Sequence, residues 1–277
     1  MNELLIAEFD TLIQLLENNI PANPNSKKNQ RLRKELERSL AKYFGKLESA
    51  FPYSKVGDSV SGTKHAVDAL LASFDASLTK DLVGHIATIY KIGSDEMVAW
   101  GRQARESTRI IEAAPEDFEG PPMQQAINWA RDSISKAKLV DGLNEETRKQ
   151  ISTVISDGIK NKRGIPGIKS DIRHKLGWMA RGAPSDIKGL TLASRAEMIA
   201  RTETAKALSQ SSLDRMDDMG IDGKEWVTAG DSLVSPECSA NEAEGVIPAK
   251  QAFSGGKMAP PQHPNCRCAI APAILKK

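Results

Sequence analysis

The segment that follows Gly220 constrains the fold of this chain more than any other part of the sequence. Glycine and proline become dense there, helix-forming residues become few, and short runs of strand-like composition appear. We predict short strands at 225–228, 246–248 and 269–275, with a turn at 229–231. A small irregular piece of this kind has little hydrophobic core of its own, so it needs an additional source of stability.

All three cysteines of the chain lie in this segment, beside one of its four histidines. Cys238, His263, Cys266 and Cys268 form a possible Cys₃His set, because thiolate and imidazole are the ligands that a structural zinc selects. The spacing of Cys266 and Cys268 is tighter than in common zinc sites, and Ser235 stands where the partner of Cys238 would be expected. Two alternatives to zinc stay open, namely reduced thiols that pack the core and a disulfide formed after exposure outside the cell.

The sequence does not indicate an enzyme. His263 and Cys266 are too close along a proline-flanked loop to suggest a nucleophile and its base, and no local signature of thiol catalysis accompanies them. The chain has no phosphate-binding loop, dinucleotide fingerprint, H-E-x-x-H or G-x-S-x-G motif. We therefore expect no catalytic residue.

The part of the chain before Gly220 favours helices. Apolar residues recur there at intervals of three and four, which predicts helices over 2–18, 29–47, 64–80, 81–91, 94–113, 123–138, 144–162, 168–179 and 194–219. The run from Ala114 to Pro122 holds prolines, a glycine and acids, and it cannot continue a helix. We therefore predict a mainly α fold with a helical docking region over 1–113, a linker over 114–122, and a helical domain over 123–277 that ends in a small irregular β-containing cap.

The helix predicted over 194–219 places a carboxylate on an apolar face. Ser194 and Glu197 have the spacing of a capping box, which would start the helix at Ser194. Ala196, Ile199, Ala200, Glu203 and Ala207 then share one face. A carboxylate on a buried face needs a partner, or its pKa rises. The alternative is that this helix lies at the rim and Glu203 reaches solvent.

Charge is distributed in blocks along the chain. Residues 27–46 hold eight basic and two acidic residues, 148–181 hold nine basic and two acidic, and 214–244 hold nine acidic and two basic. Each block alone is typical of a solvated face, but two basic blocks favour contact with a polyanion. The acidic block would suit a basic partner or the basic surface of the chain itself. The residues expected to make the basic contacts are Lys27, Lys28, Arg31, Arg33, Lys34, Arg38, Arg148, Lys149, Lys160, Lys162 and Arg163.

The start of the sequence argues against secretion. Acidic residues at positions 3, 8 and 10 interrupt it, and no basic region precedes an apolar stretch. No run approaches the ~18 apolar residues of a membrane-spanning helix. We expect assembly in a reducing cytoplasm and no membrane partner.

Three segments resemble, in order, the phage Mu F-like head morphogenesis family, whose members are minor head proteins of tailed bacteriophages. The first runs from Ser194 to Thr204 and includes Ile199-Ala-Arg201-Thr202-Glu203. The second is Trp226-Val-Thr-Ala-Gly-Asp231. The third is Pro260-Pro-Gln-His263-Pro264-Asn-Cys266-Arg267-Cys268. The helices from about 123 are also similar to the family's domain. Family members often carry C-x-x-C after the second segment, and Ser235-Pro-Glu-Cys238 departs from that pattern, so a zinc site here would have to use His263.

The resemblance implies a structural protein of the phage head. It would associate with the portal protein and with procapsid or scaffold components, lie in the head interior of the virion after assembly in the host cytoplasm, and act in DNA packaging or delivery. The basic residues above would contact double-stranded DNA without sequence preference, or the portal. The motif residues Ser194, Arg201, Thr202, Glu203, Trp226, Asp231, His263, Pro264, Cys266, Arg267 and Cys268 would have structural roles. The alternatives are a toxin or enzyme related to Mu F-like fusions, and a free DNA-binding accessory protein.

Overall fold

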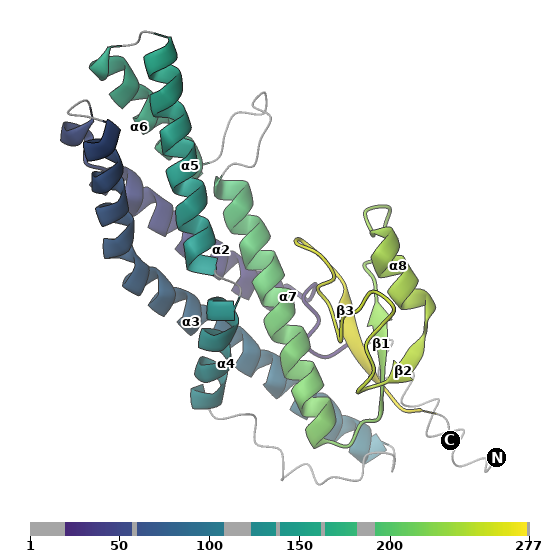
Figure 1. Cartoon of the computed structure of the whole chain (residues 1–277). Coiled ribbons are helices and arrows are strands. Elements are labelled where there is room, and N and C mark those ends of the chain that lie inside the picture. Colours follow the sequence, from purple (N-terminus) through teal and green to yellow (C-terminus); the bar gives the residue numbers. More distant parts are fainter. Residues whose placement is uncertain are drawn as a thin grey trace. The chain divides into compact units, whose positions relative to one another are not determined.

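The computed structural model describes residues 20–56, 60–107, 123–136, 139–161, 164–181 and 192–275. Over these residues the chain forms seven α-helices and a three-stranded antiparallel sheet near the C-terminus (Figure 1). The predicted mainly α fold with a small β-containing cap is therefore confirmed. The helix predicted over 2–18 and the linker predicted over 114–122 lie outside the described residues. No helix in the described part is both long and apolar enough to cross a membrane.

The helices are α2 (Lys27–Ala50), α3 (Val60–Ser107), α4 (Met123–Lys136), α5 (Leu139–Lys160), α6 (Ile165–Arg181), α7 (Leu192–Asp218) and α8 (Pro236–Ala243), with a 3₁₀ turn at Tyr53–Lys55. The strands are β1 (Gly223–Val227), β2 (Val246–Pro248) and β3 (Ala269–Ala273). The chain divides into two compact units that are each discontinuous in sequence. Unit 1 comprises Met1–Arg33, His85–Ala130 and Ile199–Lys277, and unit 2 comprises Lys34–Gly84 and Arg131–Met198.

One long helix replaces three expected ones. The helices predicted over 64–80, 81–91 and 94–113 are, in the described residues, the single helix α3. Gly93 is a poor helix former, but it serves packing here, because a Cβ at this position would lie 2.3 Å from the Ser211 Oγ of α7 and 3.0 Å from Leu208 Cδ2. The glycine thus lets α3 and α7 approach closely without ending the helix.

In unit 2, the apolar face of α2 is buried as its periodicity predicts. Leu36, Leu40, Phe44 and Leu47 are almost fully buried, and aromatic contacts add Tyr43 to this core. Elsewhere in the unit α5 packs against α6. These contacts are those of a small helical bundle.

The sequence predicted the end of helix α7 correctly but not its start. It begins at Leu192, so Ser194 lies inside the first turn and is not the N-cap residue that the S-x-x-E spacing predicts. It ends as expected before Gly220, which has a φ of 67°. The Ile221 N–H donates to the Met216 carbonyl at 2.9 Å and the Gly220 N–H to the Asp217 carbonyl at 3.1 Å. This is the Schellman arrangement that satisfies the last carbonyls of a helix.

The sheet has the strand order β2-β1-β3, and both pairings are antiparallel. The central strand β1 contacts α8, which lies beside the sheet in Figure 1. A core of buried residues unites this sheet with α3 and α7. Its members include Met97, Trp100, Met216, Met219, Trp226, Phe253, Cys238, Cys266 and Cys268. The cap therefore shares a hydrophobic core with the helices of unit 1 and does not depend on its own.

Candidate functional site

Trp226 forms the base of the candidate site. It lies on the central strand β1 with none of its surface exposed, and its ring meets Phe253 edge-on with a centroid distance of 5.2 Å. The alternation of buried and half-buried residues along β1 directs Trp226 into the core. Trp226 therefore lies in the hydrophobic core.

Helix α8 positions the first thiol. Ser235 is its N-cap residue and its side-chain oxygen accepts a hydrogen bond from the Cys238 N–H at 3.2 Å, while Pro236 follows at the first helical position. Serine followed by proline is a strong signal for the start of a helix. The serine side chain accepts a hydrogen bond from a free backbone N–H, and proline has no N–H that would need a partner. This short helix was not predicted from the sequence, where the density of glycine and proline suggested an irregular segment.

The loop from Gln262 to Cys268 is held by contacts to three distant parts of unit 1. The Asn265 N–H donates to Thr202 Oγ1 of α7 at 3.0 Å. Arg267 forms a two-pronged ion pair with Asp231, at 2.5 Å and 2.6 Å. The Arg267 carbonyl accepts a hydrogen bond from Asn25 Nδ2 at 2.7 Å. The three sequence motifs therefore meet at this loop, and a fourth segment joins them.

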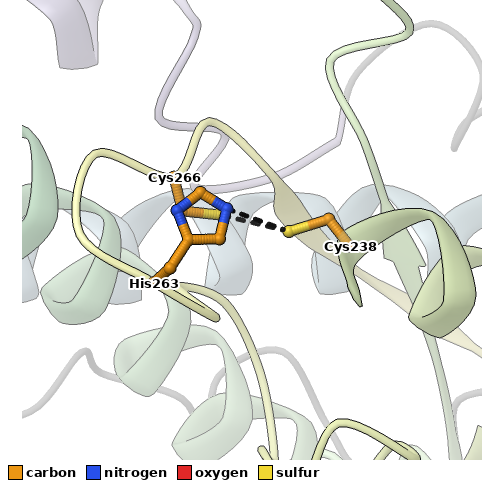
Figure 2. Close-up of side chains that lie close together, drawn as sticks. All are labelled: Cys238, His263 and Cys266. Carbon is orange, nitrogen blue, oxygen red and sulfur yellow. Dashed lines mark hydrogen bonds between the residues drawn. The ribbon is translucent and has the colours of Figure 1, made fainter. Parts of the chain in front are cut away.

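Three of the four predicted metal ligands converge beneath the loop. Cys238 Sγ lies 3.5 Å from His263 Nε2 and 3.8 Å from Cys266 Sγ. The three donor atoms all lie within 4.8 Å of one another. Figure 2 shows the Cys238 side chain pointing from α8 toward the loop that carries His263 and Cys266. The Cys268 thiol is outside this group of three.

These separations fit a tetrahedral zinc ion. With Zn–S bonds of about 2.3 Å and Zn–N bonds of about 2.0–2.1 Å, tetrahedral geometry places two sulfur atoms about 3.8 Å apart and a sulfur and a nitrogen about 3.5 Å apart. The observed distances of 3.8 Å between Cys238 and Cys266 and 3.5 Å between Cys238 and His263 equal those edges. These two separations are compatible with a tetrahedral zinc ion, and they are also those of hydrogen bonds between reduced thiols and the imidazole.

Hydrogen bonds around the donors set the His263 tautomer and the pKa of Cys266. His263 Nδ1 lies 2.9 Å from the Pro264 carbonyl, which can only accept, so Nδ1 carries the proton and Nε2 presents its lone pair to the thiols. A hydrogen bond from the Cys268 thiol lowers the pKa of Cys266, and backbone amides of Cys268 and Gln262 lower it further against the effect of burial. The same hydrogen bond raises the pKa of Cys268. Cys266 is thus the thiol most ready to act as thiolate.

Glu203 is buried, as its place on the apolar face of α7 predicts. Only 6% of its surface is exposed, and Ala196, Ile199, Ala200 and Ala207 are buried with it. Within the described parts of the chain its Oε2 atom accepts no hydrogen bond, and the Lys206 ammonium is 3.8 Å away. Burial raises the pKa of Glu203, and Lys206 partly opposes that rise. The alternative in which Glu203 reaches solvent is excluded.

The remaining motif residues are placed as follows. Arg201 is half-buried on α7, and Pro264 is exposed in the loop. The side chain of Ser194 lies outside the described residues. Two structurally important residues carried no clear sequence signal: Asn25, which binds the loop from far away in the chain, and Lys224, a fully buried lysine on β1.

The predicted basic residues have different surroundings. Lys27, Lys28, Arg31, Lys34, Arg38 and Lys149 are exposed, and Arg33 is half-buried. Lys28 pairs with Glu96 at 2.9 Å, and Arg148 pairs with Asp68 at 2.6 Å. The side chains of Lys160, Lys162 and Arg163 lie outside the described residues. The N-terminal part of α2 therefore presents the basic face that contact with a polyanion requires.

Comparison with known proteins finds a family model that spans the three motifs. Residues 148–271 match the family model described as Phage Mu protein F like protein. The matched segment includes all three motifs and the whole Cys/His group, and it begins later than the 123 expected from the sequence. No curated protein and no solved structure matches the chain.

Proposed function

We propose that this protein is a minor phage head protein that assembles at the portal vertex, because residues 148–271 match the family model described as Phage Mu protein F like protein. The observation that carries the proposal is the meeting of the three family motifs at one loop, through the Thr202–Asn265 and Asp231–Arg267 contacts and the Cys238–Cys266 pair. A family match with scattered motifs would suggest only distant descent. A match whose three motifs meet at one loop supports a structural role for that loop.

The Cys/His group has a structural role in this proposal. Cys238, His263 and Cys266 hold a zinc ion in this proposal. Cys268, two residues beyond Cys266 in the same loop, would complete the four ligands. Four protein ligands leave no open position for a substrate, so zinc would stabilise the cap and carry out no chemistry. This agrees with the Mu F-like family, whose members are structural head proteins that are not known as enzymes.

The exposed basic face of α2 supports contact with the packaged DNA. Lys27, Arg31 and Lys34 are exposed and follow one another at intervals of four and three, which places them on one side of the helix. Lysine and arginine on one face neutralise phosphates without reading bases, so binding would be independent of sequence and weakened by salt. This contact would act during packaging or delivery of the DNA.

The experiment that tests the portal assignment is a pull-down on purified portal rings from the same phage. We expect the protein to be retained by portal rings and not by rings of an unrelated phage. Retention by neither ring, with DNA binding intact, would favour a free DNA-binding accessory protein and would overturn the assignment.

DNA contact is tested separately by measuring affinity for duplex DNA across a range of salt concentrations. Replacing Lys27, Arg31 and Lys34 with Gln should reduce the slope of log affinity against log salt by up to about 3, because each lost phosphate contact removes about 0.9. Replacing the exposed Lys64, Lys80 and Lys250 with Gln is the matched control, and it should change the slope less. Equal changes in both triple variants would mean that α2 has no particular role in binding.

A further inference from the structure

A cavity of about 370 Å³ opens beside the Cys/His loop. One wall is α7, with Thr202, Glu203, Lys206 and Leu213 among its residues, and the other is the segment from Lys257 to Pro264. Its volume lies within the range of about 300–1,000 Å³ that is usual for ligand pockets. Neither the zinc site nor the basic face of α2 gives this cavity a function.

A buried acceptor whose hydrogen-bonding capacity is not used belongs to a residue in the wall of the cavity. Glu203 lines it, and only 6% of the Glu203 surface is exposed. No group among the residues that the structure describes donates a hydrogen bond to its Oε2 atom. Buried polar groups are nearly always hydrogen-bonded, because an unsatisfied one costs free energy. A carboxylate that burial disfavours is therefore missing a donor at this position.

The walls suit a long side chain with a cationic end. Leu213, Met258, Ala259 and Pro260 supply apolar surface on both sides of the cavity. Lysine and arginine carry an apolar stem and a charged head, so the stem can lie along such walls while the head reaches a carboxylate. Arginine has the better fit, because its planar guanidinium can donate two hydrogen bonds to one carboxylate.

One acidic segment of the same unit favours a basic partner. Residues 214–244 hold nine acidic and two basic residues and belong to unit 1, as the cavity does. Lys206 and Lys257 also line the cavity, and they oppose an incoming cation locally. Lys206 is 3.8 Å from the Glu203 carboxylate, which is too far for a hydrogen bond, so an arginine would be the stronger partner.

We propose that this cavity receives an arginine side chain from a partner polypeptide and that Glu203 binds its guanidinium group. The identification of that partner as another head component rests on the proposed function, whereas the binding chemistry does not. The cavity would then be an attachment point of the domain, next to the loop that its three motifs build.

The test uses the full chain and N-acetyl-arginine methylamide as the probe, with the isosteric but uncharged citrulline derivative as the control probe. Binding is followed by NMR titration. We expect saturable binding of the arginine probe, at least about tenfold weaker binding of the citrulline probe, and a similar loss with Glu203→Gln, because a charge-assisted hydrogen bond is removed. The variant Asp217→Asn, an exposed acid on the same helix, should bind the arginine probe like the original chain.

Two further variants keep the proposal testable if Glu203→Gln does not fold. Lys206→Met removes the competing cation and should tighten binding of the arginine probe. Met258→Trp places a larger side chain at an exposed wall position and should weaken it. Absence of saturable binding, equal binding of the two probes, unchanged binding by Glu203→Gln, or weaker binding by Lys206→Met would overturn the proposal. This titration uses no phage component. Its outcome therefore does not depend on whether the portal pull-down succeeds.

Discussion

The Asn265 N–H donates a hydrogen bond to Thr202 Oγ1 across 63 residues of sequence, with an N···O distance of 3.0 Å. This bond joins the first motif, on α7, to the third, in the loop that carries His263 and Cys266. Asn265 itself has a φ of 66°, a left-handed conformation that asparagine tolerates better than most residues. The contact thus fixes the position of the loop at the point where its backbone turns.

Thr202→Val should lower the free energy of unfolding by about 0.5–1.5 kcal/mol, because it removes this acceptor while preserving the shape of the side chain. Chemical denaturation of the full chain would measure the change. Thr202→Ser keeps the hydroxyl and should recover most of the loss. If the valine variant is as stable as the original chain, the bond does not hold the loop.

Gly93→Ala should destabilise unit 1 by about 1–3 kcal/mol, because the added methyl group would overlap Ser211 Oγ and force α3 and α7 apart. Gly84→Ala is the matched control in the same helix. A Cβ at position 84 meets nothing within 4 Å, so alanine there should stabilise the helix by about 0.5–1 kcal/mol. We expect Gly93→Ala to lower the unfolding temperature and Gly84→Ala to raise it. Shifts in the same direction would contradict the close packing of α3 and α7.

Lys224 should make stability depend on pH in the alkaline range. Its side chain is fully buried, its Nζ donates to the Met258 carbonyl at 2.8 Å, and burial lowers its pKa to about 8. Between about 8 and the ordinary value of 10.5 the unfolded chain binds more protons than the folded chain, so stability rises with pH across that window. Lys224→Met should remove this rise, and the exposed Lys250→Met should not. The same slope in all three proteins would refute the burial of a charged lysine.

The zinc proposal predicts one zinc ion per chain and a lower unfolding temperature after chelation. Cys238→Ser, Cys266→Ser and Cys268→Ser should each reduce zinc affinity strongly, because each removes a thiolate ligand. Equilibrium competition with a chromophoric chelator would measure the affinities. Full zinc affinity in Cys268→Ser would exclude that residue as the fourth ligand, and absence of zinc from the original chain at any concentration would exclude the site.

Periodicity predicted helix α2 well, because this helix has an apolar face and a charged face. The stripe of Leu36, Leu40, Phe44 and Leu47 is buried as expected, and the carboxylate of Glu203 is buried with its apolar neighbours on α7. Local signals failed where packing between distant segments decides the structure. Gly93 is an example, because only the presence of Ser211 explains why the helix continues through a glycine.

The candidate site could be predicted in its members but not in its geometry. The residues Cys238, His263 and Cys266 are evident from their types and their concentration at one end of the chain, and they do converge. The short helix that positions Cys238 has only eight residues, too few to show periodicity, although Ser235 and Pro236 carry its start signal. The contact from Asn25 to the loop could not be foreseen, because nothing local to Asn25 indicates a partner 242 residues away.

We propose that the loop at which the three motifs meet is needed for this protein to bind to a phage head. Co-sedimentation with procapsids of its own phage tests this proposal most directly. We expect the original chain to sediment with procapsids, and Cys238→Ser and Cys266→Ser to lose that association, whereas Asp217→Asn should retain it. Sedimentation of none of these proteins at any salt concentration would contradict the assignment to the head. If both cysteine variants sediment with procapsids as fully as the original chain, the loop is not needed for binding to the head.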